Sequence, residues 1–246
     1  MEKQIFGTVY FDDVPVDVGS SLGEGKRFSI GDSIREKTIR WIKAGPLLVA
    51  DRCVCMNISW NQLDELGLVR GALVQVDGQA YQCRCLQAGA SMPNGQTGLA
   101  DFEDLGEWGA VLQACGKRDA TWHWKDQYFW CQDTPNGYVV TRIVCGSRSP
   151  RFKGGFRSDD KQETVGFRPV LEMIPTKVEL SKDLIGDRLE VSLSHGAALI
   201  GKLVSFDDYD VVVEPTGIPL RAPILLLPSG EVVVSREDIA MLQKFD

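Results

Sequence analysis

Cysteine and histidine are the residue types in this 246-residue chain best suited to bind metal or act as nucleophile and base. Cys53 and Cys55 form one closely spaced pair, and Cys83 and Cys85 form another. Four thiolates could bind zinc tetrahedrally. Residues two apart on a strand simply share a face, however, and unpaired cysteine is a common small core residue. We therefore predict that these cysteines occupy core positions and that the protein has no metal site and no cofactor. Zinc binding by the two pairs is the alternative.

A thiol nucleophile needs a base beside it, and one stretch of sequence offers both. Cys131 follows His123 closely and precedes Asp133, all within one aromatic segment. Catalytic groups usually converge from separate segments, so we predict no catalytic residue. An enzyme of unrecognised type that uses Cys131 and His123 is the alternative. The second histidine, His195, lies too far along the chain to predict a histidine cluster.

The same aromatic segment and the basic loop that follows it are candidates for ligand contacts. Residues 142–168 hold seven Lys or Arg against three Asp or Glu. An exposed basic loop beside tryptophan suits an anion, a glycan or a protein, although such charge runs are often only solubilising. The predicted contacts are Trp122, Trp124, Arg148, Arg151, Lys153 and Arg157.

Local patterns predict the elements that would position these residues. Asp32 could cap a helix that ends at Ala44, because apolar side chains recur there at helical spacing. Ser59 is a plausible N-cap for a short helix, with Gln62 at the capping-box position. Alternating runs on both sides of Asp77-Gly78 predict a β-hairpin, because this dipeptide suits a tight turn.

The segment "VGFRPVLEMI" predicts the closing strand of the first domain. Phe167 is the expected buried anchor of this strand. Arg168 precedes Pro169, and a residue before proline avoids the helical region, so Arg168 is held extended. Buried arginine is normally paired, and we therefore predict a structural role for Phe167 and Arg168 rather than ligand contact.

"RIVCGS" at residues 142–147, the Arg-Ser at residues 157–158 and "GFRPVLE" at residues 166–172 resemble the end of the sulfatase-modifying, or formylglycine-generating, fold. That fold is a relative of the C-type lectin fold. The resemblance implies an α+β domain over residues 1–174 whose loops bind ligand. The family's two catalytic cysteines precede the Gly-Phe-Arg strand, and no cysteine stands there in this chain, so we expect its copper–thiolate oxidation to be absent.

Residues 176–246 have the short, closely spaced strands of a small all-β barrel. Gly201, Phe206, Asp207 and Tyr209 resemble the first motif of Sm-like barrels. The resemblance implies assembly into an oligomer or RNA binding. Residues 177–246 carry seven basic and twelve acidic residues, and this excess of negative charge disfavours contact with phosphates. We expect a homo-oligomer through this barrel and keep RNA binding as an alternative.

Composition and charge limit the remaining possibilities. The net charge of −7 disfavours nucleic acid as a partner. No apolar run is long enough to span a membrane, and no secretory segment is recognisable, so we expect a cytoplasmic protein with no membrane partner. The closing segment is similar to that of bacterial and prophage proteins. If the protein derives from a prophage, the alternative location is the virion. The predicted function is non-catalytic binding of an unidentified ligand or receptor.

Overall fold

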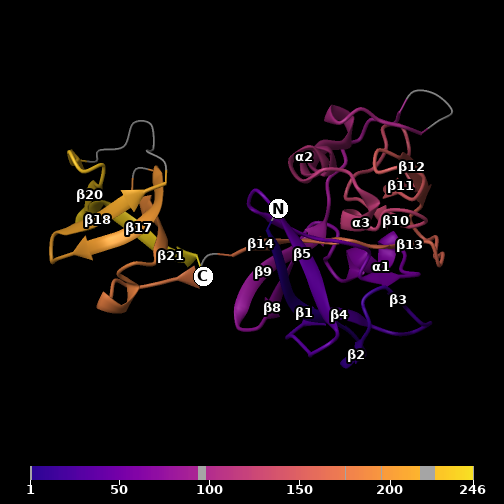
Figure 1. Cartoon of the computed structure of the whole chain (residues 1–246), viewed down its shortest axis with the longest axis horizontal. Coiled ribbons are helices and arrows are strands. Elements are labelled where there is room, and N and C mark those ends of the chain that lie inside the picture. Colours follow the sequence, from indigo (N-terminus) through magenta and orange to yellow (C-terminus); the bar gives the residue numbers. More distant parts are fainter. Residues whose placement is uncertain (1, 94–97, 175, 195, 217–224, 246) are drawn as a thin grey trace. The chain divides into compact units, whose positions relative to one another are not determined.

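The computed structural model describes residues 2–93, 98–174, 176–194, 196–216 and 225–245 (Figure 1). The chain divides into two compact units, Met1–Met173 and Ile174–Asp246. Both units are built mainly from β-strands with a few short helices, so the helical share is smaller than the predicted α+β class implies. None of the helices in the described part of the chain has the length and apolar character to span a bilayer.

An eight-stranded antiparallel sheet forms most of the first half of the first unit. Its order is β2-β1-β5-β6-β14-β9-β8. The eighth strand, β4, lies off this order and also pairs with β1. The closing strand β14 thus lies between strands from two earlier hairpins. The strands are β1 (Lys3–Phe11), β2 (Val14–Val16), β4 (Phe28–Gly31), β5 (Thr38–Ala44), β6 (Leu47–Ala50), β8 (Ala72–Val76), β9 (Gln79–Cys85) and β14 (Pro169–Met173).

The helix predicted for Asp32–Ala44 is wrong, because most of this segment is the strand β5. Trp41 packs in a core cluster with Phe167, whereas its neighbour Ile42 packs in a second cluster with Trp108. The sheet therefore packs against apolar residues on both faces around β5 and β6. A strand with both faces buried lacks the usual alternation of apolar and polar residues, and its apolar positions can match helical spacing by chance.

A second, six-stranded sheet has the order β12-β11-β10-β13-β7-β3. The pairs β10–β13 and β3–β7 are parallel, and the others are antiparallel. The closing segment contributes to both sheets, because β13 belongs here and β14 to the first sheet, with Arg168 between them. The strands are β3 (Ser20–Ser21), β7 (Cys55–Met56), β10 (Tyr128–Trp130), β11 (Thr141–Gly146), β12 (Lys153–Arg157) and β13 (Val165–Phe167).

Two local predictions are confirmed in this unit. Ser59 and Gln62 form a reciprocal capping box at the start of α1 (Trp60–Glu65). Asp77 and Gly78 both have positive φ in the turn between β8 and β9. The other helical elements are the 3-10 turn η1 (Glu103–Leu105), α2 (Gly106–Cys115) and α3 (Asp119–Trp122).

The second unit is one antiparallel seven-stranded sheet of order β15-β21-β16-β17-β18-β20-β19. Leu189, Leu203 and Val213 lie at the centre of its apolar core. Gly201 allows close approach of β18, because a Cβ there would lie 2.4 Å from Glu214 O. The strands are β15 (Thr176–Lys177), β16 (Arg188–Leu193), β17 (Ala198–Phe206), β18 (Asp210–Pro215), β19 (Leu225–Leu226), β20 (Val232–Ser235) and β21 (Ile239–Phe245); the 3-10 turns are η2 (Lys182–Leu184) and η3 (Arg236–Asp238).

Candidate functional site

Trp122 is a core residue, and its prediction as a ligand contact is wrong. It is fully buried at the end of α3, and its ring packs edge-to-face on Trp108 with centroids 5.2 Å apart. Its indole Nε1 donates to Gly116 O at 2.7 Å. The segment turns through a short helix and a left-handed His123, φ 42°, instead of running as a strand. Trp122 and Trp124 therefore do not share an exposed face.

Lys153 is also buried, which corrects its prediction as a surface contact. Its Nζ donates to Ala88 O at 2.6 Å and to Asp104 O at 2.7 Å. Burial lowers the pKa of this amine, with the nearby Cys145 as the largest opposing influence. Because the amine is used in joining two chain segments to β12, Lys153 has a structural role.

Trp124 and Arg151 do come together, at an open hollow of about 340 Å³ on the first unit. Trp124 and Arg151 are half-buried, and the neighbouring Lys117 is exposed. An aromatic ring and two cations thus meet at one surface position. The lining residues are Lys117, Trp124, Ser149, Pro150 and Arg151.

Hydrogen bonds to main-chain oxygens hold the walls of this hollow. Ser147, which has a left-handed backbone with φ 64°, donates its N–H to Trp124 O at 2.8 Å. The Trp124 indole donates to Lys117 O at 3.1 Å, which orients the ring. The buried Trp108 donates to Pro150 O at 2.8 Å and connects the second wall to α2. The loop conformation is therefore set before any ligand arrives.

The other predicted arginines lie outside the hollow. Arg148 is exposed, with its guanidinium 5.5 Å from the centre of the Phe152 ring. Arg157 is exposed at the end of β12 and pairs with Asp159 at 3.0 Å. The structure thus groups only Trp124 and Arg151 from the six predicted contacts, and it adds Lys117.

Phe167 and Arg168 occupy buried positions that suit their predicted structural role. The Phe167 ring packs edge-to-face on Phe28 with centroids 5.7 Å apart. Arg168 donates from Nη2 to Trp122 O at 2.6 Å, and its guanidinium lies 4.7 Å from the centre of the Phe129 ring. Burial lowers the pKa of Arg168. Its main hydrogen-bond partner is thus a main-chain carbonyl.

Cys131 and His123 have different partners. Cys131 is fully buried, and burial followed by a contact with Cys145 raises the pKa of its thiol well above 9.0. His123 Nε2 instead lies 2.8 Å from Arg52 Nη2 and 3.6 Å from Asp51 Oδ2. Within the part of the chain that the structure describes, Cys131 therefore has no adjacent imidazole.

The two cysteine pairs have different surroundings. Cys83 and Cys85 share a core cluster with Cys55, whereas Cys53 belongs to the other cluster. All seven cysteines are free thiols. Within the described residues, no group of three or more His, Cys, Asp or Glu side chains is placed to hold a metal ion.

Sequence reasoning missed a charged cluster around Asp51, a buried carboxylate just after β6. Arg52 binds its Oδ1 through Nε at 2.9 Å, and Arg40 Nη1 lies 3.8 Å from its Oδ2. These three residues help line a hollow of about 370 Å³. The only signal in the sequence was the charged pair Asp51-Arg52 directly after an apolar run. His195 lies outside the described residues and cannot be placed in any cluster.

Comparison with protein-family models, with curated proteins and with solved structures found no match to this chain. An indole face beside lysine and arginine can stack on a sugar ring or a planar group while the cations bind a carboxylate, sulfate or phosphate.

Proposed function

We propose that this protein is a non-catalytic binding protein whose first unit recognises an acidic glycan. The observation that carries the proposal is the meeting of Trp124, Lys117 and Arg151 at one open hollow. The exposed Asp101 lies 3.7 Å from Arg151, and an exposed ion pair of this kind contributes little. A ligand carboxylate or sulfate could therefore replace Asp101 at small cost.

The buried thiols favour binding over catalysis. Burial raises the pKa of Cys53 to about 11, and burial also raises the pKa of Cys55 and Cys83. A catalytic cysteine needs a thiolate near neutral pH and access to substrate. Cys115, which is half-buried, also has a raised pKa through burial. These environments give little support to the alternative of a thiol enzyme.

We also propose a fold family for each unit. The first unit would be a divergent lectin-type, sulfatase-modifying-like scaffold without catalytic cysteines, which is supported by the passage of one closing segment through two sheets. The second unit would be Sm-like. Support comes from the close packing at Gly201 and from Asp207, whose Oδ1 accepts from the N–H groups of Tyr209 and Asp210 at 2.8 Å each.

The second unit would join copies of the chain into a homo-oligomer. β19 pairs with β20 alone among the described strands, and Leu225 and Leu226 on it are 62% and 52% exposed. Apolar side chains on an edge strand favour pairing with another chain. Light scattering after gel filtration tests this: the Leu225→Asp, Leu226→Asp double variant should be smaller than the wild type. Equal masses would contradict assembly through β19.

An array of neutral and acidic oligosaccharides tests the ligand class. We expect the full chain to bind uronic acid or sulfated sugars and to ignore the neutral counterparts. Trp124→Ala and Arg151→Ala should each weaken binding about tenfold or more, which corresponds to roughly 1.4 kcal/mol. Arg157→Ala is the matched control, because Arg157 is exposed but lies outside the hollow. Failure of every acidic sugar to bind, or equal binding by all variants, would contradict the proposal.

A further inference from the structure

The first sheet has two strand edges, those of β4 and β8, that lie close together but are not paired. β8 ends the strand order at one edge, and β4 lies off that order and pairs with β1 alone over Phe28–Gly31. The two strands contact each other in space, yet no β-ladder or β-bridge joins them among the described residues. The sheet therefore curls as in a barrel. The barrel is not closed, because the described residues of β4 and β8 do not form a ladder.

Side chains close one end of this gap. Ser33 donates its N–H to Asp77 Oδ1 at 2.8 Å, and Asp77 donates its N–H to Asp32 Oδ1 at 2.7 Å. These residues follow directly after β4 and β8. Toward the other end of both strands lies an open hollow of about 600 Å³.

The registers identify the backbone groups that face the gap. In an antiparallel ladder, alternate residues bond to one neighbour and the others point away from it. Asp12 N–H bonds to Arg27 O at 3.0 Å, so along β4 the N–H and C=O groups of Phe28 and Ile30 point away from β1. Counting from the Asp77 turn in the same way, the groups of Leu73 and Gln75 point away from β9.

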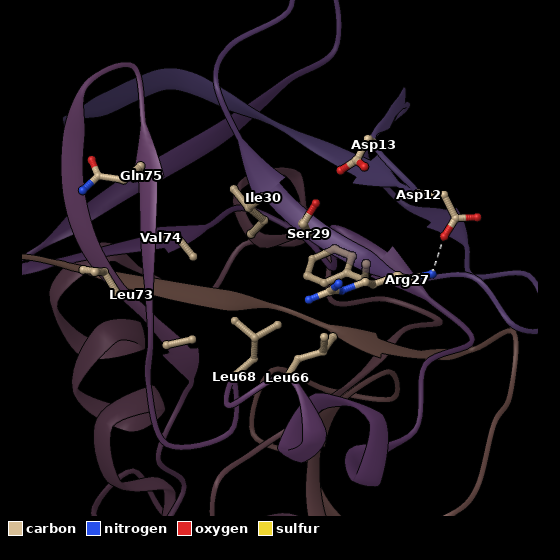
Figure 2. A pocket seen from close by; sticks show the side chains of 12 residues that line it. Asp12, Asp13, Arg27, Ser29, Ile30, Leu66, Leu68, Leu73, Val74 and Gln75 are labelled. Atoms are coloured by element: carbon tan, nitrogen blue, oxygen red, sulfur yellow. Dashed lines mark hydrogen bonds between the residues drawn. The ribbon is translucent and has the colours of Figure 1, made fainter.

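The hollow combines these outward backbone groups with an apolar floor (Figure 2). Phe28, Ile30 and Leu68 are buried, whereas Leu73 is 67% exposed. The full lining is Asp12, Asp13, Arg27, Phe28, Ser29, Ile30, Leu66, Leu68, Ala72, Leu73, Val74 and Gln75. A ligand that satisfies either edge must itself present alternating N–H and C=O groups, which is what an extended peptide does.

Arg27 adds a charge requirement. Its side chain is exposed, and Figure 2 shows it turned toward the hollow, which Arg27 helps to line. Its neighbour Lys26 pairs with Asp12 at 2.7 Å, but no carboxylate in the described residues lies within ion-pair distance of the Arg27 guanidinium. A carboxylate on the ligand would complete this end of the site.

We propose that the gap between β4 and β8 binds an extended peptide of another protein, with apolar side chains at alternate positions and a carboxylate for Arg27. The peptide backbone pairs with the outward groups of Leu73 and Gln75, or of Phe28 and Ile30, and its apolar side chains lie on the floor of the hollow. This site is separate from the Trp124 hollow and does not depend on the function proposed for it.

A phage-displayed library of random linear dodecapeptides, selected on the full chain, tests the proposal. We expect selected peptides to share alternating β-branched residues and one Asp or Glu. On binding of a synthetic copy of a selected peptide, hydrogen exchange should slow at Phe28, Ile30, Leu73 or Gln75. No enrichment, or slowed exchange confined to other residues, would overturn the proposal, as would full protection of these amides before peptide is added.

Matched variants test the two recognition elements separately. Leu73→Pro removes the outward N–H and should weaken binding about tenfold, whereas Leu73→Ala keeps that N–H and should bind within about threefold of the wild type. Arg27→Gln in the protein should weaken binding as much as replacement of the peptide carboxylate, Asp→Asn or Glu→Gln, does. Lys26→Gln is the control variant for Arg27→Gln. Equal affinity of all variants would overturn the proposal. If Leu73→Pro fails to fold, the Arg27 pair and the exchange experiment on the wild type still decide.

Discussion

Arg168 donates a hydrogen bond to the main-chain oxygen of Trp122 at 2.6 Å, which joins the closing segment to the end of α3. Both residues are fully buried. Among the described residues, the Nε and Nη1 groups of Arg168 have no hydrogen-bond partner, and its guanidinium lies 4.7 Å from the centre of the Phe129 ring and 5.3 Å from that of Trp108. The junction between the two sheets of the first unit is therefore built around one cation.

Replacement of this cation should destabilise the first unit. Arg168→Ala removes the bond to Trp122 O and leaves a cavity beside Phe129, so we expect the free energy of unfolding to fall by about 3 kcal/mol. Urea unfolding followed by tryptophan fluorescence measures this change. Arg148→Ala, at an exposed arginine, should change stability by no more than about 0.5 kcal/mol. Equal stability of the two variants would contradict the structural role of Arg168.

Thiol labelling should distinguish Cys115 from the other six cysteines. Cys115 is half-buried, whereas the others are buried. Burial raises the pKa of Cys131 well above 9.0, which suppresses its thiolate as well as its access to reagent. In native protein at about pH 8, iodoacetamide should label Cys115 first, and the others should react only in denaturant. Rapid labelling of Cys131 at neutral pH would instead favour the thiol enzyme.

Acidification should destabilise the chain through His123. Burial and then the charge of Arg52 lower the pKa of His123 from 6.5, against the opposing influence of Asp51 and Asp119. The unfolded chain therefore takes up its proton at a higher pH than the folded chain does. Stability should fall as pH drops from above 6.5 through the lowered pKa. Urea titrations at several pH values measure this, and His123→Gln should flatten that part of the curve; an unchanged curve would refute it.

Gly166 should not tolerate a side chain. A Cβ there would lie 2.5 Å from Cys55 O and 2.6 Å from Met56 Sδ, both on the neighbouring strand β7. Gly166→Ala must therefore separate β13 from β7, and we expect a loss of about 2 kcal/mol in thermal or urea unfolding. Gly23→Ala, whose Cβ would meet only Lys26 Cγ at 3.4 Å, should be within about 0.5 kcal/mol of the wild type.

Features of the fold that depend on adjacent residues could be predicted from the sequence. The Asp77-Gly78 turn and the Ser59 cap each depend on a few neighbouring residues, and both are present. The prediction failed for β5 because its two apolar faces contact different core clusters formed by distant segments. No local pattern distinguishes that arrangement from a buried helix.

The candidate site was predicted only in part, for a similar reason. Trp124 and Arg151 line the hollow, but Trp122 and Lys153 have the same residue types and neighbouring positions and are buried. Trp122 is buried by its contact with Trp108 on α2, and Lys153 by its bond to Ala88 O, 65 residues earlier in the sequence. Composition alone could not separate an exposed tryptophan from a buried one two residues away.

The two apolar faces of the first sheet change what protects its strand register. In a sheet with one wet face, a slip by one residue exposes apolar side chains to water and is rejected for that reason. In β6, where all four residues are buried, a slip would exchange one set of buried side chains for another, such as Leu48 for Val49. Shape and volume, rather than solubility, must therefore reject misaligned pairings of this strand during folding.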